Sequence, residues 1–225
     1  MIAETRYKCE NDMKNLILDR LARIATVGVL LGSLTAPLVP AGAQDAALRQ
    51  QAIDWYDRVL ADDCRPFNEA AALFDDVEQE MPGQYDLTKT AGNRGGSITL
   101  FEFLCDAGAY NIRNVYVEYS DGRFRLLSFA SPAISVDYAS DADNAAVSSI
   151  TITGFDARLT VTNSEFDPST AILKETAYWR GVGDASNETW WRYYDGRFVL
   201  ERFLVDASYD GEINPQLDVT WPRTR

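Results

Sequence analysis

The sequence YSDGRF at residues 119–124 returns as YYDGRF at residues 193–198, and this repeat decides how the chain folds. An Asp-Gly pair between strand-forming residues is typical of a two-residue type I′ hairpin, because both central positions need a positive φ. The repeat therefore predicts two similar β-hairpins. A paired anion site at Arg123 and Arg197 is the alternative interpretation, but turn chemistry alone explains most of the matching residues.

Strand-like segments continue on both sides of each hairpin, and no helical pattern long enough for a parallel crossover separates them. Ile98–Leu104 is a dense apolar run, and the segments Ser149–Thr153 and Arg158–Thr162 are β-branched and alternate. The expected strands are Ile98–Leu104, Val115–Tyr119, Arg123–Phe129, Ile134–Tyr138, Ser149–Thr153, Arg158–Thr162, Ala171–Tyr178, Thr189–Tyr194 and Phe198–Val205, with Gly154-Phe155-Asp156 separating the fifth from the sixth. We therefore predict a mostly antiparallel β-meander over residues 97–225.

Residues 44–82 have a helical pattern instead. Apolar residues recur at spacings of three and four in a first helix, namely Leu48, Ala52, Trp55 and Val59. A second helix is expected from Asn68 to about Glu80, and residues 84–96 have the polar, glycine-rich composition of a loop. The predicted fold class is α+β, with two N-terminal helices packed on the meander in a single domain, residues 44–225.

Residues 1–43 carry the pattern of a bacterial secretory signal. Three basic residues lead into an apolar run at residues 24–39, and residues 41–43 read Ala-Gly-Ala, a cleavage site. A membrane anchor is the alternative, but this run is shorter than about 20 apolar residues and contains glycine and proline. We expect cleavage before Gln44, with Met13 as a second candidate start that would make the preceding residues a start-site extension. The mature protein is then periplasmic or secreted, with no membrane segment.

The composition excludes several classes of function. The chain has 34 acidic and 21 basic residues, a net charge of −13, which repels nucleic acid and suits a cation or a basic protein partner. It contains no histidine, which excludes Ser-His-Asp and Cys-His catalysis and His-ligated zinc.

Two cysteines remain beyond the expected signal, Cys64 and Cys105. An isolated pair in an oxidising compartment is typical of a structural disulfide. The two are too far apart in the sequence for a Cys-x-x-Cys redox motif. We therefore predict a Cys64–Cys105 disulfide.

The segment Arg180-Gly181-Val182-Gly183-Asp184 is the strongest candidate for a binding site. Two glycines let a backbone approach a ligand closely, and the flanking charges could bind groups of opposite charge. An irregular turn closed by an Arg–Asp ion pair is the alternative interpretation.

The acidic segment at residues 137–144 is a candidate calcium site through Asp137, Asp141 and Asp143, because calcium prefers clustered oxygen ligands. It lacks the glycine and the final glutamate of an EF-hand loop, so a solvated acidic loop is the alternative. We expect no other cofactor.

Several motifs occur in a fixed order over residues 97–225. They are Cys105-x-x-Gly108-Ala109-Tyr110-Asn111, Phe166-Asp167-Pro168-x-Thr170, Arg180-Gly181-x-Gly183-Asp184, Trp191 with Asp195-Gly196-x-Phe198-x-Leu200, and Trp221-Pro222-Arg223. Together they resemble a family of secreted and periplasmic proteobacterial proteins, domain-of-unknown-function family 1176. The resemblance implies an exported domain and no assigned activity. In that family a cysteine typically follows the Gly-Asp pair, whereas Ala185 stands here, which implies that one bridge is lost and Cys64–Cys105 is kept.

The absence of a catalytic signature and the high acidity favour a non-catalytic exported protein that binds an envelope component or a basic protein, such as a lysozyme-like hydrolase. A carboxylate-based hydrolase of envelope glycans is one alternative. A scaffold protein without a ligand is the other.

Overall fold

The computed structural model describes residues 41–72, 82–87, 97–142 and 145–221. All of them belong to one compact unit, Ala41–Arg225. The predicted signal segment lies outside the described residues, apart from its last three residues, which begin the first described helix.

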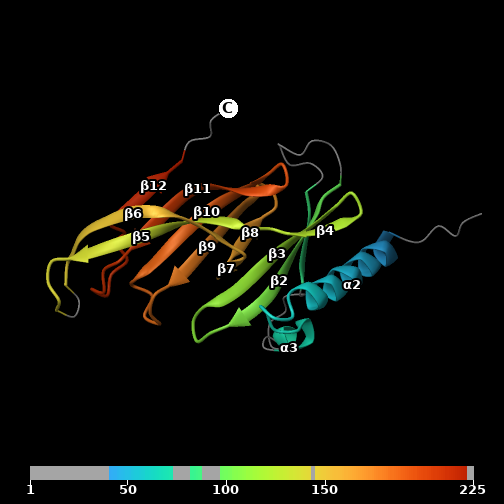
Figure 1. The fold of residues 1–225 in the computed structure, drawn as a ribbon, viewed down its shortest axis with the longest axis horizontal. Coiled ribbons are helices and arrows are strands. Elements are labelled where there is room, and N and C mark those ends of the chain that lie inside the picture. The colour runs from blue at the N-terminus through green and yellow to red at the C-terminus, as the bar shows by residue number, and fades with distance from the viewer. Residues whose placement is uncertain (1–40, 73–81, 88–96, 143–144, 222–225) are drawn as a thin grey trace, which may run out of the picture. The chain divides into compact units, whose positions relative to one another are not determined.

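Two helices and twelve strands make up the described part of the chain (Figure 1). The helices are α2 (Ala41–Val59) and α3 (Phe67–Ala71). The strands are β1 (Gly83–Asp86), β2 (Thr99–Ala107), β3 (Ile112–Ser120), β4 (Arg123–Leu126), β5 (Phe129–Tyr138), β6 (Val147–Arg158), β7 (Thr160–Thr162), β8 (Glu165–Asp167), β9 (Ile172–Tyr178), β10 (Ser186–Tyr194), β11 (Arg197–Asp206) and β12 (Leu217–Thr220). Every described pairing is antiparallel, which agrees with the predicted class in its broad form.

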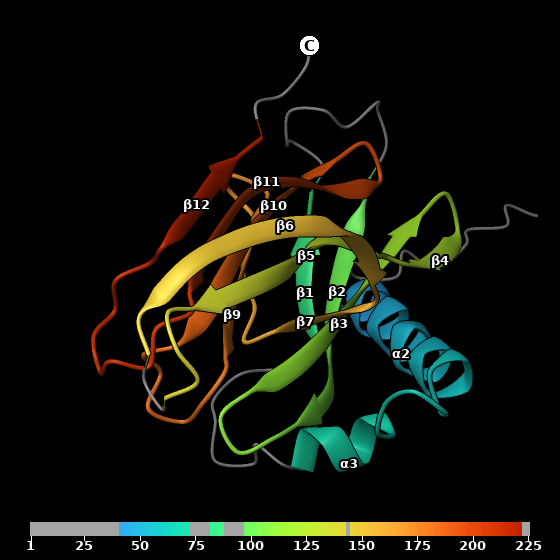
Figure 2. The same cartoon turned by 60° about the vertical axis from the view of Figure 1, so that its left-hand side comes forward.

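The strands form three sheets where a single meander was expected. The first sheet has the order β1-β2-β3-β4, and β7 also pairs with β3. The second sheet has the order β12-β11-β10-β9-β8, while β5 and β6 form a two-stranded ribbon (Figure 2).

The strand β2 is buried on both faces, which explains its nearly continuous apolar sequence. Leu100 lies in a core that joins the first and second sheets and includes Tyr116, Trp191 and Phe198. Phe101 and Phe103 face the opposite way because side chains alternate along a strand. They pack on α2, in a second core.

The buried stripe of α2 consists of Ala52 and Tyr56, and Leu60 continues it just beyond the end of the helix. The prediction that Val59 belongs to this stripe is wrong, because Val59 is 47% exposed. Tyr56 stacks on Phe103, with ring centroids 4.6 Å apart, and its hydroxyl donates to the carbonyl of Leu104 at 2.8 Å. The aromatic residue one position beyond Trp55 therefore anchors the helix.

The predicted disulfide between Cys64 and Cys105 is confirmed. It ties the segment between α2 and α3 to strand β2. The second predicted helix begins at Phe67 as α3, and its expected continuation over residues 73–81 lies outside the described residues.

Two further predictions need correction. The segment Gly154–Asp156 lies inside β6, because Gly154 sits where the pairing with β5 shifts by one residue, so the glycine marks a bulge in place of a turn. Strand β1 forms at the start of the segment expected to be a loop, and Tyr85 pairs there with Leu100.

Both Asp-Gly turns have the predicted type I′ backbone. The φ angles are 50° at Asp121 and 75° at Gly122, and 49° at Asp195 and 78° at Gly196. The two hairpins also contact each other, since the guanidinium of Arg125 donates to the carbonyl of Gly196 at 2.7 Å.

Candidate functional site

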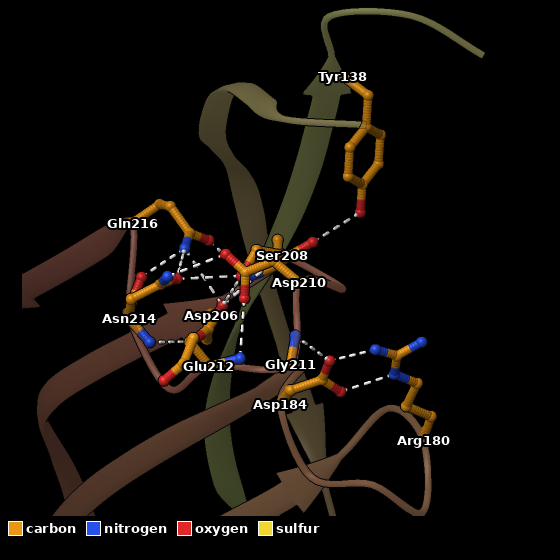
Figure 3. A network of polar contacts seen from close by, with 11 residues as sticks. Tyr138, Arg180, Asp184, Asp206, Ser208, Asp210, Gly211, Glu212, Asn214 and Gln216 are labelled. Carbon is orange, nitrogen blue, oxygen red and sulfur yellow. Dashed lines mark hydrogen bonds and ion pairs between the residues drawn. The ribbon is translucent and has the colours of Figure 1, made fainter. Parts of the chain in front are cut away.

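The turn from Arg180 to Asp184 connects β9 to β10 and contains the predicted ion pair. The Arg180 Nε donates to Asp184 Oδ1 at 2.6 Å, and a second guanidinium nitrogen contacts Oδ2. Figure 3 shows that Asp184 also accepts from the backbone nitrogen of Gly211, at 2.9 Å. The carboxylate thus joins this turn to the loop between β11 and β12.

These contacts stabilise the ionised form of the Asp184 carboxyl, although the residue is only 3% exposed. The hydrogen bonds from Arg180 lower the pKa of the Asp184 carboxyl to about 2, against the opposing effect of burial. The guanidinium of Arg180 also lies over the ring of Tyr209, 4.9 Å from its centroid. The charges of Arg180 and Asp184 therefore pair with each other, and this ion pair closes the turn as the alternative interpretation expects.

The two glycines of the turn lie against tyrosine rings. A Cβ at Gly181 would lie 3.3 Å from Cδ1 of Tyr110, and one at Gly183 would lie 3.5 Å from Cε1 of Tyr178. Gly183 also has a φ of +83°, which favours glycine. The glycines allow the turn to pack closely on the protein itself.

The loop from Asp206 to Gln216 is the polar feature that the sequence interpretation missed. Asp206 is 2% exposed, and its carboxylate accepts from the Ser208 hydroxyl at 2.7 Å and from the Asn214 backbone nitrogen at 2.5 Å. The Gln216 side chain donates to the same carboxylate at 3.2 Å. One aspartate therefore organises this whole loop.

A signal for this loop was present in the sequence. Asp206-x-Ser208-x-Asp210-Gly211 follows the first half of an EF-hand loop, but Leu217 stands where the final glutamate would be. Within the described residues, no group of three or more acidic, cysteine or histidine side chains is placed to hold a metal ion. The loop is closed by its own hydrogen bonds.

The predicted calcium segment lies beside this loop. Asp137, at the end of β5, accepts from the Ser149 hydroxyl at 2.7 Å, Asp141 is exposed, and Asp143 lies outside the described residues. The Tyr138 hydroxyl donates to the carbonyl of Ala207 at 3.1 Å (Figure 3). Calcium binding at these aspartates stays a prediction.

We use the name loop end for the Arg180–Asp184 turn, the Asp206–Gln216 loop and Tyr138 together. The structure thus brings the two sequence-predicted candidate regions to adjoining positions through a loop that neither prediction included. Val182 and Ile213, one in each of the two loops, are 76% and 79% exposed. Asp210 and Glu212 are exposed next to Ile213.

The buried carboxylates of the sheets are engaged in structural contacts. Glu102 is 4% exposed and accepts from Tyr85 at 2.8 Å and Asn114 at 2.7 Å. Glu175 is 0% exposed and accepts from Arg158 at 2.7 Å. A general acid must reach its substrate, and these two groups are turned into the protein interior.

No family model, curated protein or solved structure matches this chain. The resemblance to domain-of-unknown-function family 1176 therefore stays a prediction. In the part of the chain that the structure describes, no helix is both long and apolar enough to cross a bilayer.

Proposed function

We propose that this protein is an exported, non-catalytic binding protein whose loop end docks a basic protein partner. The observation that carries the proposal is the display of Val182 and Ile213 on two loops joined through Asp184. Among the residues that the structure describes, these two are the most exposed large apolar side chains. An apolar side chain on a fixed backbone loses little conformational entropy when a partner covers it.

The charges around the loop end favour a cationic partner. Asp210 and Glu212 are exposed and come shortly before the exposed Ile213 in the same loop, and the whole chain carries a net charge of −13. Acidic groups at the rim of an apolar contact accelerate the approach of a basic protein and reject an acidic one. The Cys64–Cys105 disulfide and the signal pattern support a periplasmic or secreted location.

The first test measures binding of a lysozyme-type enzyme, used as the cationic probe, to the exported and oxidised protein. We expect the Val182→Ser and Ile213→Ser variants to bind at least about tenfold more weakly, since apolar anchors at the centre of an interface dominate its energy. Val199→Ser is the matched control, because Val199 is 37% exposed on β11, outside the loop end. Absence of probe binding, or equal loss in the control, would overturn the proposal.

The second test separates the charge contribution from the apolar one. Glu212→Gln should slow association and reduce its dependence on salt, because rim charges act mainly on the rate of encounter. Glu165→Gln is the control, since Glu165 is an exposed residue on β8. Equal effects of the two substitutions would show that only the net charge matters and would count against docking at the loop end.

A further inference from the structure

The outer edge of strand β6 is unusual for a chain of this charge. Among the described residues, β6 pairs with β5 alone, so one edge of a twelve-residue strand has no partner strand. The sequence from Val147 to Phe155 contains no charged residue and no proline. Soluble proteins commonly use lysine, proline or short length to block such an edge, because its free N–H and C=O groups can pair with another strand.

Two bulges limit the regular part of this edge. Ser148 and Thr153 have no partner in β5, so the ladder has two regular parts, Gly154–Arg158 and the neutral stretch Ser149–Ile152. In this stretch Ile150 packs toward the core under the ribbon, while Ser149 and Thr151 are exposed. The available edge is therefore short and has one apolar and one hydroxyl-bearing face.

The sequence around Thr151 is symmetric in residue type. Isoleucines occupy the positions on either side of it, at 150 and 152, and hydroxyl-bearing residues follow at Ser149 and Thr153. Apolar residues stand four positions away on both sides, at Val147 and Phe155. An antiparallel pairing of two identical strands around Thr151 places Ile150 of each copy opposite Ile152 of the other.

We propose that β6 pairs antiparallel with β6 of a second copy of this chain, about a two-fold axis at Thr151. The pairing joins two ribbons into one four-stranded sheet, and the free backbone N–H and C=O groups of each β6 edge form hydrogen bonds with the other copy. Two chains of charge −13 repel each other over most of their surfaces. Contact between two copies is therefore least unfavourable at an uncharged segment, and β6 offers one that is also symmetric in sequence. The contact is small, so the dimer is weak and forms at high protein concentration.

The like charges of the two copies give this dimer a diagnostic salt dependence. Screening removes repulsion between like-charged copies, so self-association should strengthen between about 0.02 and 0.5 M salt. Docking of a basic partner at the loop end should weaken over the same range. The two proposals therefore fail or succeed independently.

The test combines sedimentation velocity of the oxidised protein with one substitution at Thr151 and a matched one at Ser135. Thr151→Lys places two lysines against each other at the axis and should abolish the dimer. Ser135→Lys is the matched control, because Ser135 lies directly opposite Thr151 on the same face of the ribbon but on β5. We expect this control to dimerise like the unmodified protein. A protein that is monomeric at millimolar concentration, or a dimer that survives Thr151→Lys, would overturn the proposal.

A cross-linking experiment gives an independent readout. Residues paired across an antiparallel ladder have Cα atoms about 4.5–5.5 Å apart, within the range of a disulfide. Thr151→Cys should therefore form a covalent dimer under mild oxidation, whereas Ser135→Cys should stay monomeric. Equal cross-linking of the two variants would show random collision in place of the proposed pairing.

Discussion

The two Asp-Gly hairpins share their sequence and their turn geometry, yet they end in different environments. The first continues into β4, which stops after four residues, whereas the second continues into β11, which runs for ten. Phe124 of the first hairpin packs half-buried beside α2, and its counterpart Phe198 is 5% exposed in the core between the first two sheets. The repeated residues thus specify the turn, and the residues beyond them specify burial.

The hairpins also differ in what they contribute to their contact. The first supplies Glu118, which is 2% exposed, and Arg125, which donates to it at 2.6 Å. The second supplies the Tyr193 hydroxyl, which donates to the same carboxylate, and the carbonyl of Gly196. Burial acts to raise the pKa of Glu118, but hydrogen bonds from Ser120, Tyr193 and Arg125 together lower it below its usual value.

The largest difference between equivalent positions should be that between the two phenylalanines. Phe198→Ala is expected to lower the free energy of unfolding by about 3–5 kcal/mol, because the ring is packed among several other aromatic rings. Phe124→Ala should cost roughly half as much, since part of the ring is already in water. Urea unfolding of the oxidised variants measures both, and equal losses would contradict the proposed asymmetry.

The two tyrosines that precede the turns provide a smaller contrast. Tyr193→Phe removes a donor from the buried carboxylate of Glu118 and should cost about 1.5–3 kcal/mol. Tyr119 contacts the ring of Phe124, so Tyr119→Phe keeps this contact and should change stability by less than about 0.5 kcal/mol. Denaturant titrations of both variants test this difference directly, and a costly Tyr119→Phe would argue against it.

The turn glycines should differ by less. Alanine at Gly122 carries the strain of positive φ alone, about 1–2 kcal/mol, because its Cβ would have no atom within 4 Å beyond the adjoining residues of the chain. Alanine at Gly196 carries the same strain and also places its Cβ 2.5 Å from a guanidinium nitrogen of Arg125. The arginine can swing away, but it then leaves the buried Glu118, so we expect about 1 kcal/mol of additional loss. The additional loss should vanish when Arg125→Gln is already present.

The smallest expected effect is a shift in acid unfolding. The pKa of Glu118 is lowered in the folded protein, so its contribution is present above the unfolded pKa and is lost as pH falls through the folded pKa. Tyr193→Phe removes one hydrogen bond that lowers this pKa, so the variant should unfold at a higher pH than Tyr119→Phe. Circular dichroism between pH 6 and about pH 2 follows this loss, and coincident curves for the two variants would contradict it.

The parts of the fold that could be predicted have local causes. The type I′ turns follow from Asp-Gly pairs, and the disulfide follows from there being only two cysteines beyond residue 43. The alternation of side chains along a strand also has a local cause, and in β10 it leaves Trp191 and Tyr193 buried and Tyr194 43% exposed.

The parts that were missed depend on distant partners. Strands β1, β8 and β12 have only three or four residues each, and such short segments become strands because a neighbour pairs with them. The division into three sheets likewise depends on pairing: β4 pairs in the first sheet, whereas β5, the next strand in the chain, pairs with β6 in a separate ribbon.

Two parts of the candidate site were predicted from the sequence, and the loop that connects them was not. The Arg180–Asp184 pair could be foreseen from its charges, but its bond to Gly211 joins residues 27 positions apart in the chain. Asp206 organises its loop through hydrogen bonds to backbone and side-chain groups, and its spacing to Ser208 and Asp210 was the available signal.

The Cys64–Cys105 disulfide makes the stability of the chain depend on the redox state of its surroundings. It closes a loop of 41 residues, which should contribute about 4 kcal/mol, mainly by restricting the unfolded chain. Both cysteines precede every strand of the second sheet, so in an oxidising environment the bridge can close before that sheet has formed. In a reducing environment the chain lacks this bridge and is the easier substrate for proteases, so the same covalent bond links the lifetime of the protein to the redox state around it.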